Sequence, residues 1–343
     1  MRATIALCAA LVPATALAAA AGAAAGGTVA PDAARRTADA AREFIVPAWA
    51  YPTDPAGAAP RPAPDATTPL QVPSSSAAFT RAQLVDLFAA PDWHPDGHAP
   101  MPDVVANGRK PAVYACGFCH LPDGNGRPEN APLAGLPAAY VVAQMAAFRS
   151  GARQSAWKLP HLPGDLMRKA AAAVTDEEVA AAAAYFSSLR LTRRVEIVEA
   201  RRVPRTHMAG WLYAMSAGTA TEPLGERIIE VALDHERHEL RDSAVGYRAY
   251  VPRGSVARGK LLAVRGVDGP ATACVACHGA DLRGVGLVPP LAGRSPSYVL
   301  RQLLAFRTGA RSTAAGEPMQ PVVQRLAIGD MIALAAYVAL QPP

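Results

Sequence analysis

The chain is predicted to be mainly α-helical, with two tandem copies of one helical domain, a proline-rich N-terminal strap and a small β-containing insert between the copies. Two observations predict this fold class. One five-residue cysteine pattern occurs twice, and the residues after each occurrence repeat at a constant offset of 158. A length of 343 residues is sufficient for two domains that each bury a core.

The repeated pattern is C-x-x-C-H. Its residues are Cys116, Cys119 and His120 in the first half and Cys274, Cys277 and His278 in the second. This spacing is the attachment signature of a c-type haem, in which two thiolates add to the vinyl groups and the histidine faces the iron. The sequence therefore predicts two covalently bound c-type haems, with His120 and His278 as iron ligands.

Two other chemistries for the cysteines stay open at this point. A structural zinc site needs a second nearby pair of ligands for each C-x-x-C, and neither half has another cysteine. A thioredoxin-like dithiol needs a βαβ pattern, which the sequence lacks, and leaves both histidines unexplained. Haem attachment is the interpretation that uses every residue of the pattern.

Residues 1–25 are predicted to be a signal peptide, because Arg2 precedes an apolar alanine-rich segment with small-residue cleavage sites. The alternative is a retained anchor, although the segment is weakly hydrophobic for a bilayer span. We expect an exported, periplasmic protein with no membrane span after the leader is cleaved. Cys8 lies in the leader, so the other four of the five cysteines all belong to the two patterns.

The net charge does not point to nucleic acid as a partner. The formal charge of +6 falls to +5 without Arg2, and four haem propionates would offset most of the remainder. No cluster of Lys and Arg interleaved with aromatic residues is present.

Residues 26–78 are predicted to be a linker or strap. A short helix is expected at 31–42, and eight prolines follow between Pro47 and Pro73. Such a stretch buries little apolar surface, and Trp49 and Tyr51 favour a strap that lies on a folded surface. From Phe79 to Phe88 the apolar pattern predicts an amphipathic helix capped by Thr80.

The two predicted domains span residues 79–192 and 253–343. Both contain a helix after a Leu-Ala-Gly turn, with the apolar faces at Tyr140 to Phe148 and at Tyr298 to Phe306. After six extra residues in the first half, a last helix follows in each copy. Thr175 and Glu178 predict a capping box for the first of these helices, whereas the second has only Ala327 there. A duplicated domain is the simplest account.

Residues 193–252 are predicted to be a β-rich insert. Strands are expected at 195–198, 227–231 and 246–251, with turns at Gly218, Pro223 and Gly225.

Met167 and Met319 are the candidate sixth ligands of the two irons. They occupy the same place in the repeat, in a predicted loop before the last helix. A methionine sulfur is typical of electron-transfer haems and raises their potential, while a core packing role is the alternative. His161 is the rival ligand in the first half, but the second half lacks a counterpart. The remaining histidines, which include His94, His98, His207, His235 and His238, are expected at the surface.

These motifs resemble the dihaem class I cytochromes c of the bacterial periplasm, of the cytochrome c4 type. The resemblance covers residues 105–190 and 256–341 and is carried by C-x-x-C-H, Pro-Leu-Ala-Gly, Tyr-x-x-x-Gln-x-x-x-Phe-Arg-x-Gly-x-Arg and the methionine. It implies two class I cytochrome c domains with His/Met coordination, and Pro132 and Pro290 carbonyls on the proximal histidines. It also implies that Tyr140, Tyr298, Arg153 and Arg311 lie near propionates. The long N-terminus and the insert depart from that family.

The resemblance implies an electron carrier with redox protein partners, such as a respiratory donor and acceptor, a dehydrogenase or a terminal oxidase. Two alternatives stay open. A dihaem peroxidase would need one iron with a displaceable sixth ligand, whereas the two halves here offer equivalent methionines. A cytochrome subunit of a periplasmic dehydrogenase would have the same haem chemistry.

Overall fold

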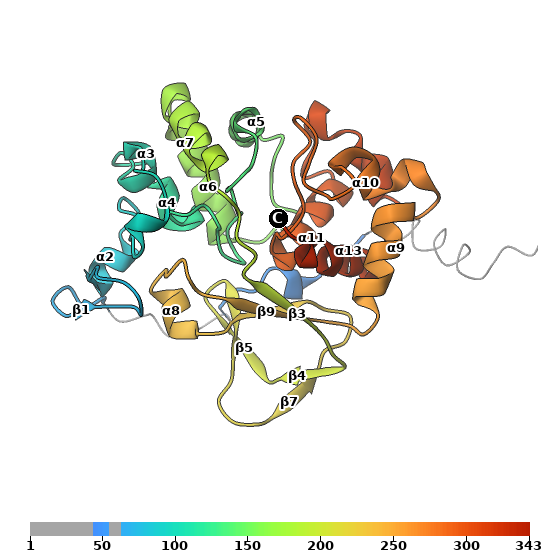
Figure 1. Ribbon diagram of the computed structural model, residues 1–343, viewed down its shortest axis with the longest axis horizontal. Coiled ribbons are helices and arrows are strands. Elements are labelled where there is room, and N and C mark those ends of the chain that lie inside the picture. Colours follow the sequence, from blue (N-terminus) through green and yellow to red (C-terminus); the bar gives the residue numbers. More distant parts are fainter. Residues whose placement is uncertain (1–43, 55–62) are drawn as a thin grey trace, which may run out of the picture.

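The computed structural model describes residues 44–54 and 63–343. The predicted signal peptide, the predicted helix at 31–42 and part of the predicted strap therefore lie outside the described residues. The described chain folds into two helical units that lie side by side, with strands beneath both (Figure 1).

The first helical unit follows the expected pattern, with the haem-motif helix between a short helix and three longer ones. Its helices are α3 (Asp103–Ala106), α4 (Cys116–His120), α5 (Ala138–Arg149), α6 (Leu162–Ala173) and α7 (Asp176–Ser188). The predicted capping box is present, since Thr175 Oγ1 accepts from the Glu178 amide and Glu178 accepts from the Thr175 amide. This box fixes where α7 begins.

The second helical unit repeats this order. Its elements are α9 (Ser255–Arg265), η3 (Pro270–Thr272), α10 (Cys274–His278), α11 (Pro296–Arg307), η4 (Ala314–Gly316), α12 (Met319–Val323) and α13 (Ile328–Leu340). Ala327 has no capping side chain, but the Asp330 carboxylate accepts from the Ala327 amide at 3.1 Å. Helix α13 therefore begins with only one of the two hydrogen bonds of a capping box.

The first helices of the two units differ in length. Gly259 lies inside α9, where it touches α13, whereas the equivalent Gly108 has φ +63° and follows the end of α3. A Cβ on Gly259 would lie 2.0 Å from the Ala333 carbonyl oxygen. Glycine therefore permits the close crossing of α9 and α13.

The N-terminal segments are short. They are η1 (Ala48–Ala50), β1 (Pro69–Leu70), β2 (Phe79–Thr80), α2 (Arg81–Val85) and η2 (Pro95–Gly97). The helix predicted from Phe79 to Phe88 is thus shorter than expected, because Phe79 and Thr80 pair with β1. Thr80 caps it as predicted, accepting from the Gln83 amide.

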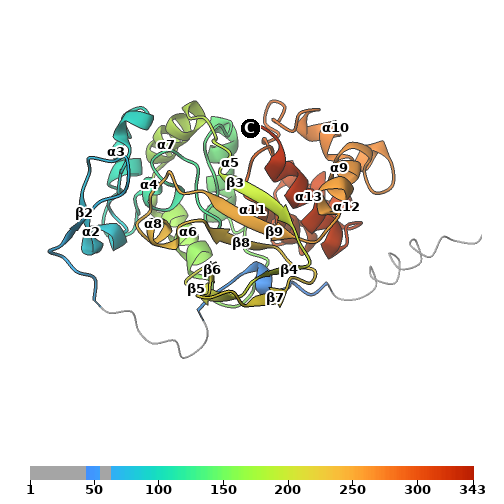
Figure 2. The same cartoon turned by 60° about the horizontal axis from the view of Figure 1, so that its bottom comes forward.

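The insert forms strands that lie across both helical units (Figure 2). Its elements are β3 (Val195–Glu199), β4 (Arg202–Pro204), β5 (Thr206–Ala209), β6 (Leu212–Met215), β7 (Thr221–Pro223), β8 (Ile229–Ala232), α8 (His235–Glu239) and β9 (Tyr247–Val251). Five strands form one sheet in the order β3-β9-β8-β6-β5, with β3 and β9 parallel. The three predicted strands are therefore confirmed, but Pro223, predicted in a turn, ends β7.

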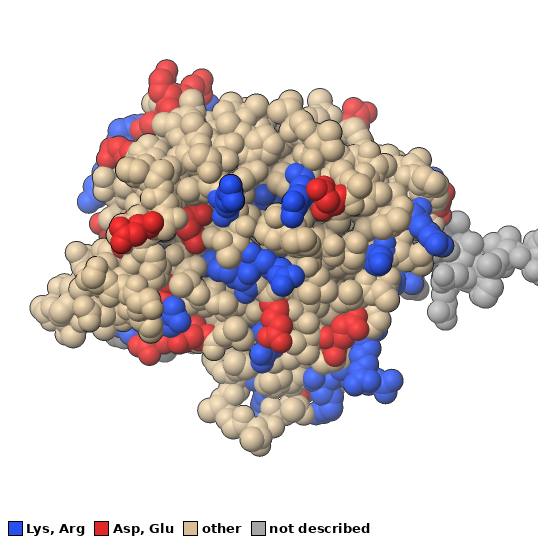
Figure 3. Space-filling model, in the orientation of Figure 1, with Lys and Arg blue, Asp and Glu red and all other residues tan. Residues whose placement is uncertain are grey.

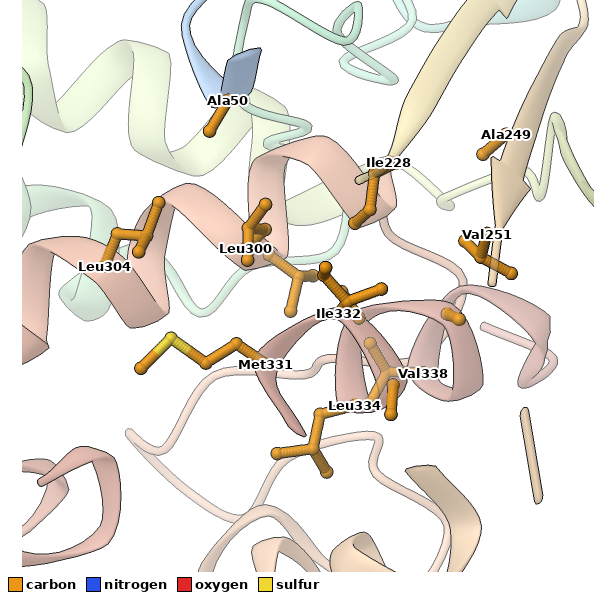
Figure 4. Packing of buried hydrophobic residues seen from close by; sticks show 14 of the residues in the cluster. Ala50, Ile228, Ala249, Val251, Leu300, Leu304, Met331, Ile332, Leu334 and Val338 are labelled. Carbon is orange, nitrogen blue, oxygen red and sulfur yellow. The ribbon is translucent and has the colours of Figure 1, made fainter. Parts of the chain in front are cut away.

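The largest core joins the insert to the second unit. Leu300 and Leu304 of α11 pack on Met331 and Ile332 of α13, with Ile228 and strands of the insert covering them (Figure 4). Because one core spans both parts, the insert is fixed to the second unit rather than standing apart. Among the described residues, no helix has the length and apolar character required to cross a membrane.

Candidate functional site

A cavity of about 240 Å³ lies in the first unit and brings together most of the site residues predicted for that unit. Cys116, Cys119 and His120 line it from α4, Met167 lines it from α6, and Tyr140 and Arg153 line it near the second unit. Its walls are largely apolar, with Val113, Leu136 and Phe148 among them. An apolar pocket with a few converging polar groups is what a haem requires.

The two histidines predicted as proximal ligands have equivalent environments. His120 Nδ1 lies 2.8 Å from the Ala131 carbonyl oxygen, and His278 Nδ1 lies 2.8 Å from the Pro289 carbonyl oxygen. A carbonyl only accepts, so each Nδ1 carries the proton and each Nε2 keeps its lone pair. Burial lowers the pKa of both rings, which favours the neutral imidazole that binds metals.

The expected acceptor carbonyls are therefore wrong by one residue. Pro132 and Pro290 do not accept from the histidines; the residue before each proline does. Their own carbonyls face a different donor, because Arg294 donates to the Pro132 oxygen at 2.6 Å and to the Pro290 oxygen at 2.7 Å.

Met167 lies inside α6 rather than in the predicted loop. Pro163 is accepted in the first turn of this helix, and the run of alanines after Met167 favours helix. The sulfur-bearing side chain still lines the cavity that His120 lines. In the second unit Met319 begins the short helix α12, which spans five residues. It packs against the same core as Cys274 and Tyr298.

His161 also lines the first cavity, although it has no counterpart in the second half of the repeat. It precedes α6, is 7% exposed, and packs edge-on against Tyr51 and Trp211. Its Nε2 is buried and has no hydrogen-bond partner among the described residues. Burial lowers the pKa of His161 to about 4, so the ring is neutral at pH 7. The sequence singled out His161 as the rival ligand, and its place in the cavity keeps it a candidate although the second half has no counterpart.

The predicted propionate residues meet where the two units touch. Arg153 and Arg311 pair as an isolated antiparallel bridge, and each guanidinium donates to both Gln144 and Gln302 at 3.0–3.2 Å. Arg311 also donates to the Tyr140 hydroxyl at 2.7 Å. Each unit thus binds the other through the same residues of its repeat.

This junction concentrates positive charge. Burial would raise the pKa of Tyr298, but Arg153, Arg311 and Arg294 together lower it. Arg311 Nε is buried without a hydrogen-bond partner in the described part of the chain. A carboxylate that entered here would find an unused donor and uncompensated cations, as a haem propionate requires.

Arg294 is a residue that the repeat did not reveal as functional. It is 3% exposed and donates to the carbonyls of Pro132, Ala134 and Pro290. It therefore joins the two loops whose carbonyls accept hydrogen bonds from His120 and His278. Its counterpart at the offset of 158 is Leu136, and this break in the repeat was the available signal.

The insert covers the haem motif of the first unit. The Arg241 guanidinium lies 3.5 Å from the centre of the Phe118 ring, inside the C-x-x-C-H pattern, and donates to the Phe118 carbonyl at 2.9 Å. Trp93 supports this contact from the N-terminal side, because its indole N–H donates to the Leu240 carbonyl at 2.7 Å.

A buried ionic cluster lies beside this contact. Glu129 bonds Arg127 at 2.8 Å, and His238 Nε2 lies 3.6 Å from the same carboxylate. His238 was expected at the surface, but this prediction is wrong. It is buried, because α8 folds back over the first unit. His98 is also mostly buried, held by Asp92 and the Tyr185 hydroxyl.

We expect acid to weaken the contact between the insert and the first unit. Burial lowers the pKa of His238 to about 3, so below pH 6.5 the unfolded chain binds a proton that the folded chain does not. Stability should then fall as the pH drops from 6.5 towards 4, by about 1.4 kcal/mol per pH unit at most for one proton. Glu129 acts in the same direction in the pH range where carboxylates ordinarily titrate, because Arg127 lowers its pKa despite burial.

Thermal unfolding from pH 7 to pH 4 checks this expectation. His238→Gln removes one of the titrating groups and should make the stability profile less steep between pH 6.5 and 4. His207→Gln, at an exposed position on β5, is the matched control and should leave the profile unchanged. Equal slopes in the wild type and H238Q would contradict the assignment.

The cytochrome c family profile matches residues 105–190 and 257–340, each with one C-x-x-C-H pattern. The thiosulfate dehydrogenase electron acceptor of Thiomonas intermedia is 28% identical over 240 residues, covering 68% of this chain and 81% of that protein. Cytochrome c-554(548) of Halomonas halodenitrificans is 38% identical over 69 residues, covering 20% of this chain and 83% of that protein. Cytochrome c4 of Thiocapsa roseopersicina is 40% identical over 70 residues, covering 20% and 34%, respectively.

Proposed function

Because this chain belongs to the cytochrome c family and is a dihaem electron-transfer protein, we propose that it carries single electrons from a periplasmic dehydrogenase to a respiratory acceptor. The observation that carries the proposal is the cavity of the first unit, where His120 and Met167 line the same apolar space as Cys116 and Cys119. Two saturating ligands leave the iron no open position for oxygen or peroxide.

In this proposal each haem is held by its own half of the repeat. Cys116 and Cys119, with Cys274 and Cys277, form the thioether bonds, and His120 and His278 are the proximal ligands. Met167 and Met319 are the sixth ligands. The haem in each half then supplies one reversible electron. Tyr140, Arg153, Tyr298 and Arg311 offer donors to the propionates at the junction of the units.

The domain limits are part of the proposal. We assign residues 1–25 to a signal peptide, 26–78 to the strap, 79–192 and 253–343 to the haem domains, and 193–252 to the insert. The described contacts of the strap support that role, since Arg301 donates to the Ala50 carbonyl at 2.6 Å and its guanidinium lies 5.5 Å from the Tyr51 ring centre. Trp49 and Tyr51 also pack with the main core.

A thiosulfate dehydrogenase is the donor that the comparisons favour. The relative from Thiomonas intermedia is matched over 81% of its length and is named as the electron acceptor of that enzyme. We propose the same kind of donor for this chain.

The experiment is a reduction assay on the purified ferric protein. Thiosulfate alone should leave both haems ferric, whereas thiosulfate with a catalytic amount of thiosulfate dehydrogenase should reduce two haems per chain. Hydrogen peroxide should be consumed no faster than by free haem, because neither iron has an open position. Rapid peroxide turnover, or a high-spin signal from one resting haem, would replace the carrier with a peroxidase.

A further inference from the structure

The backbone of Arg241, a residue of the insert, is strained. Its φ is +60°, in the left-handed region that bulky residues rarely adopt. Hydrogen bonds fix the residues on both sides of it. The Leu240 carbonyl accepts from the Trp93 indole at 2.7 Å. The buried Asp242 carboxylate accepts from Arg237 at 2.7 Å. Strain that the surroundings impose in this way clusters at functional positions, so the Arg241 side chain is a candidate for a function.

The Arg241 side chain lies on the C-x-x-C-H pattern of the first unit. Its guanidinium carbon is 3.5 Å from the centre of the Phe118 ring, and the group donates to the Phe118 carbonyl at 2.9 Å. Its Nε donates to the Leu84 carbonyl at 3.0 Å. Both acceptors are backbone carbonyls, which orient the guanidinium without cancelling its charge.

This charge persists at pH 7. Burial and the nearby Arg127 lower the pKa of Arg241 to about 9, while Glu129 and Glu239 oppose the shift. Glu129 is itself paired with Arg127 at 2.8 Å. His238 also faces this cluster, but burial lowers its pKa to about 3, so it is neutral at pH 7. A partly buried positive charge therefore lies against the first haem motif.

The second haem motif has a different environment. The offset of 158 makes Ala276 the counterpart of Phe118 and Cys277 the counterpart of Cys119. Phe118 is 3% exposed, whereas Ala276 and Cys277 are both exposed. The first motif is therefore covered by protein that includes a cation, and the second motif faces solvent.

We propose that Arg241 raises the reduction potential of the first haem above that of the second, so that the electron of a half-reduced chain resides in the first unit. A fixed cation beside a one-electron centre favours the reduced state, which carries one positive charge fewer. The covering protein acts in the same direction, because burial disfavours the more highly charged state. The inference rests on the proposed function, since it requires two haems that each take up one electron.

The test compares two substitutions that leave the same backbone strain. Arg241→Gln removes the charge, whereas Arg241→Lys keeps it, and both lose the planar contact with Phe118. Spectroelectrochemical titration of the holoprotein at pH 7 measures both potentials. In R241Q the equilibrium constant for reducing the first haem should fall about tenfold, which is ~59 mV for one electron, and that of the second should not change. R241K should stay within about twofold of the wild type, because the charge remains.

Three further variants complete the design. Arg241→Asn introduces a residue that tolerates a positive φ, and it should lower the same potential as far as R241Q does, whatever its stability. Met167→Ala and Met319→Ala identify the haem to which each potential belongs, because each lowers one of them.

Arg202→Gln is the matched control. Arg202 is an exposed residue of β4 and also donates to a backbone carbonyl, that of Thr221 at 2.8 Å. Strand β4 lies on the side of the insert away from both helical units (Figure 1), where Lys and Arg side chains gather at the lower edge of the surface (Figure 3). R202Q removes the same charge and should leave both potentials unchanged.

Each remaining outcome decides one question. A first haem with the lower potential in the wild type, or an R241Q variant with unchanged potentials, would overturn the inference alone. A loss in R241K as large as that in R241Q would show that packing rather than charge sets the potential, and would also overturn it. A wild type that lacks two reversible one-electron steps would overturn the proposed function itself.

Discussion

Replacing Met167 by Ala is expected to remove about half of the far-red sulfur-to-iron absorption band of the ferric protein, and Met319→Ala should remove the other half. Each loss leaves one iron without its sulfur ligand, so the potential of that haem should fall by on the order of 0.1 V, within the ~0.8 V range that axial ligands control. The open iron should also bind cyanide or carbon monoxide. Met167 lies in an alanine-rich helix, so Ala keeps the backbone of α6 intact.

His161→Ala is the control for this experiment. Since His161 lines the same cavity, it is the residue that competes with Met167 for the first iron. The variant should keep the full far-red band and both potentials. If H161A instead changes the spectrum of one haem while M167A leaves the band intact, the first iron has His/His ligation and the assignment of Met167 is wrong.

Gly259→Ala is expected to lower the stability of the second unit by about 3 kcal/mol, the upper part of the usual range for overpacking. The added Cβ would meet the Ala333 carbonyl oxygen at 2.0 Å and the Tyr337 Cβ at 2.7 Å, and both belong to α13. Backbone cannot move aside as a flexible side chain does, so the two helices must separate. The melting temperature should fall by roughly 6–12 °C.

Gly97→Ala is the matched control for that substitution. A Cβ at Gly97 meets nothing within 4 Å, and the change should alter stability by no more than ~0.5 kcal/mol. Unfolding followed by the haem absorbance and by circular dichroism measures both variants. A melting temperature of G259A within 2 °C of that of the wild type, by the range above, would show that the helices adjust at little cost.

The sequence predicted those features that local chemistry or the repeat determines. The C-x-x-C-H patterns predicted two haem sites, and Thr175 with Glu178 predicted the beginning of α7. Runs of β-branched and aromatic residues predicted β3, β8 and β9. Each of these depends on residues that are close in sequence, so no knowledge of tertiary contacts was needed.

Features that depend on long-range contact were missed. The histidine acceptors were displaced by one residue, and the proline carbonyls accept instead from Arg294, which lies in the second unit and reaches Pro132 of the first unit as well as Pro290 of its own. His238 was expected at the surface because its burial depends on α8 reaching the first unit. The loop predicted around Met167 is a helix, since the alanine run outweighs Gly164 there. The repeat also drew attention away from positions where the two units differ. One example is Arg294 of the second unit, whose counterpart in the first unit is Leu136.

The parallel pairing of β3 with β9 also has a consequence for assembly. Val195 lies opposite Tyr247 and Glu199 opposite Val251, so the chain leaves the first unit at one end of this strand pair and enters the second unit at its other end. Once this pair forms, the long segment between the two strands no longer acts as a flexible tether between the units. The effective concentration of one unit at the other, which would fall with the length of such a tether, then no longer depends on that segment. The distance between the two units is then set by a few residues at each strand end. Lengthening the excursion between these strands should therefore leave the rate of electron exchange within the molecule unchanged.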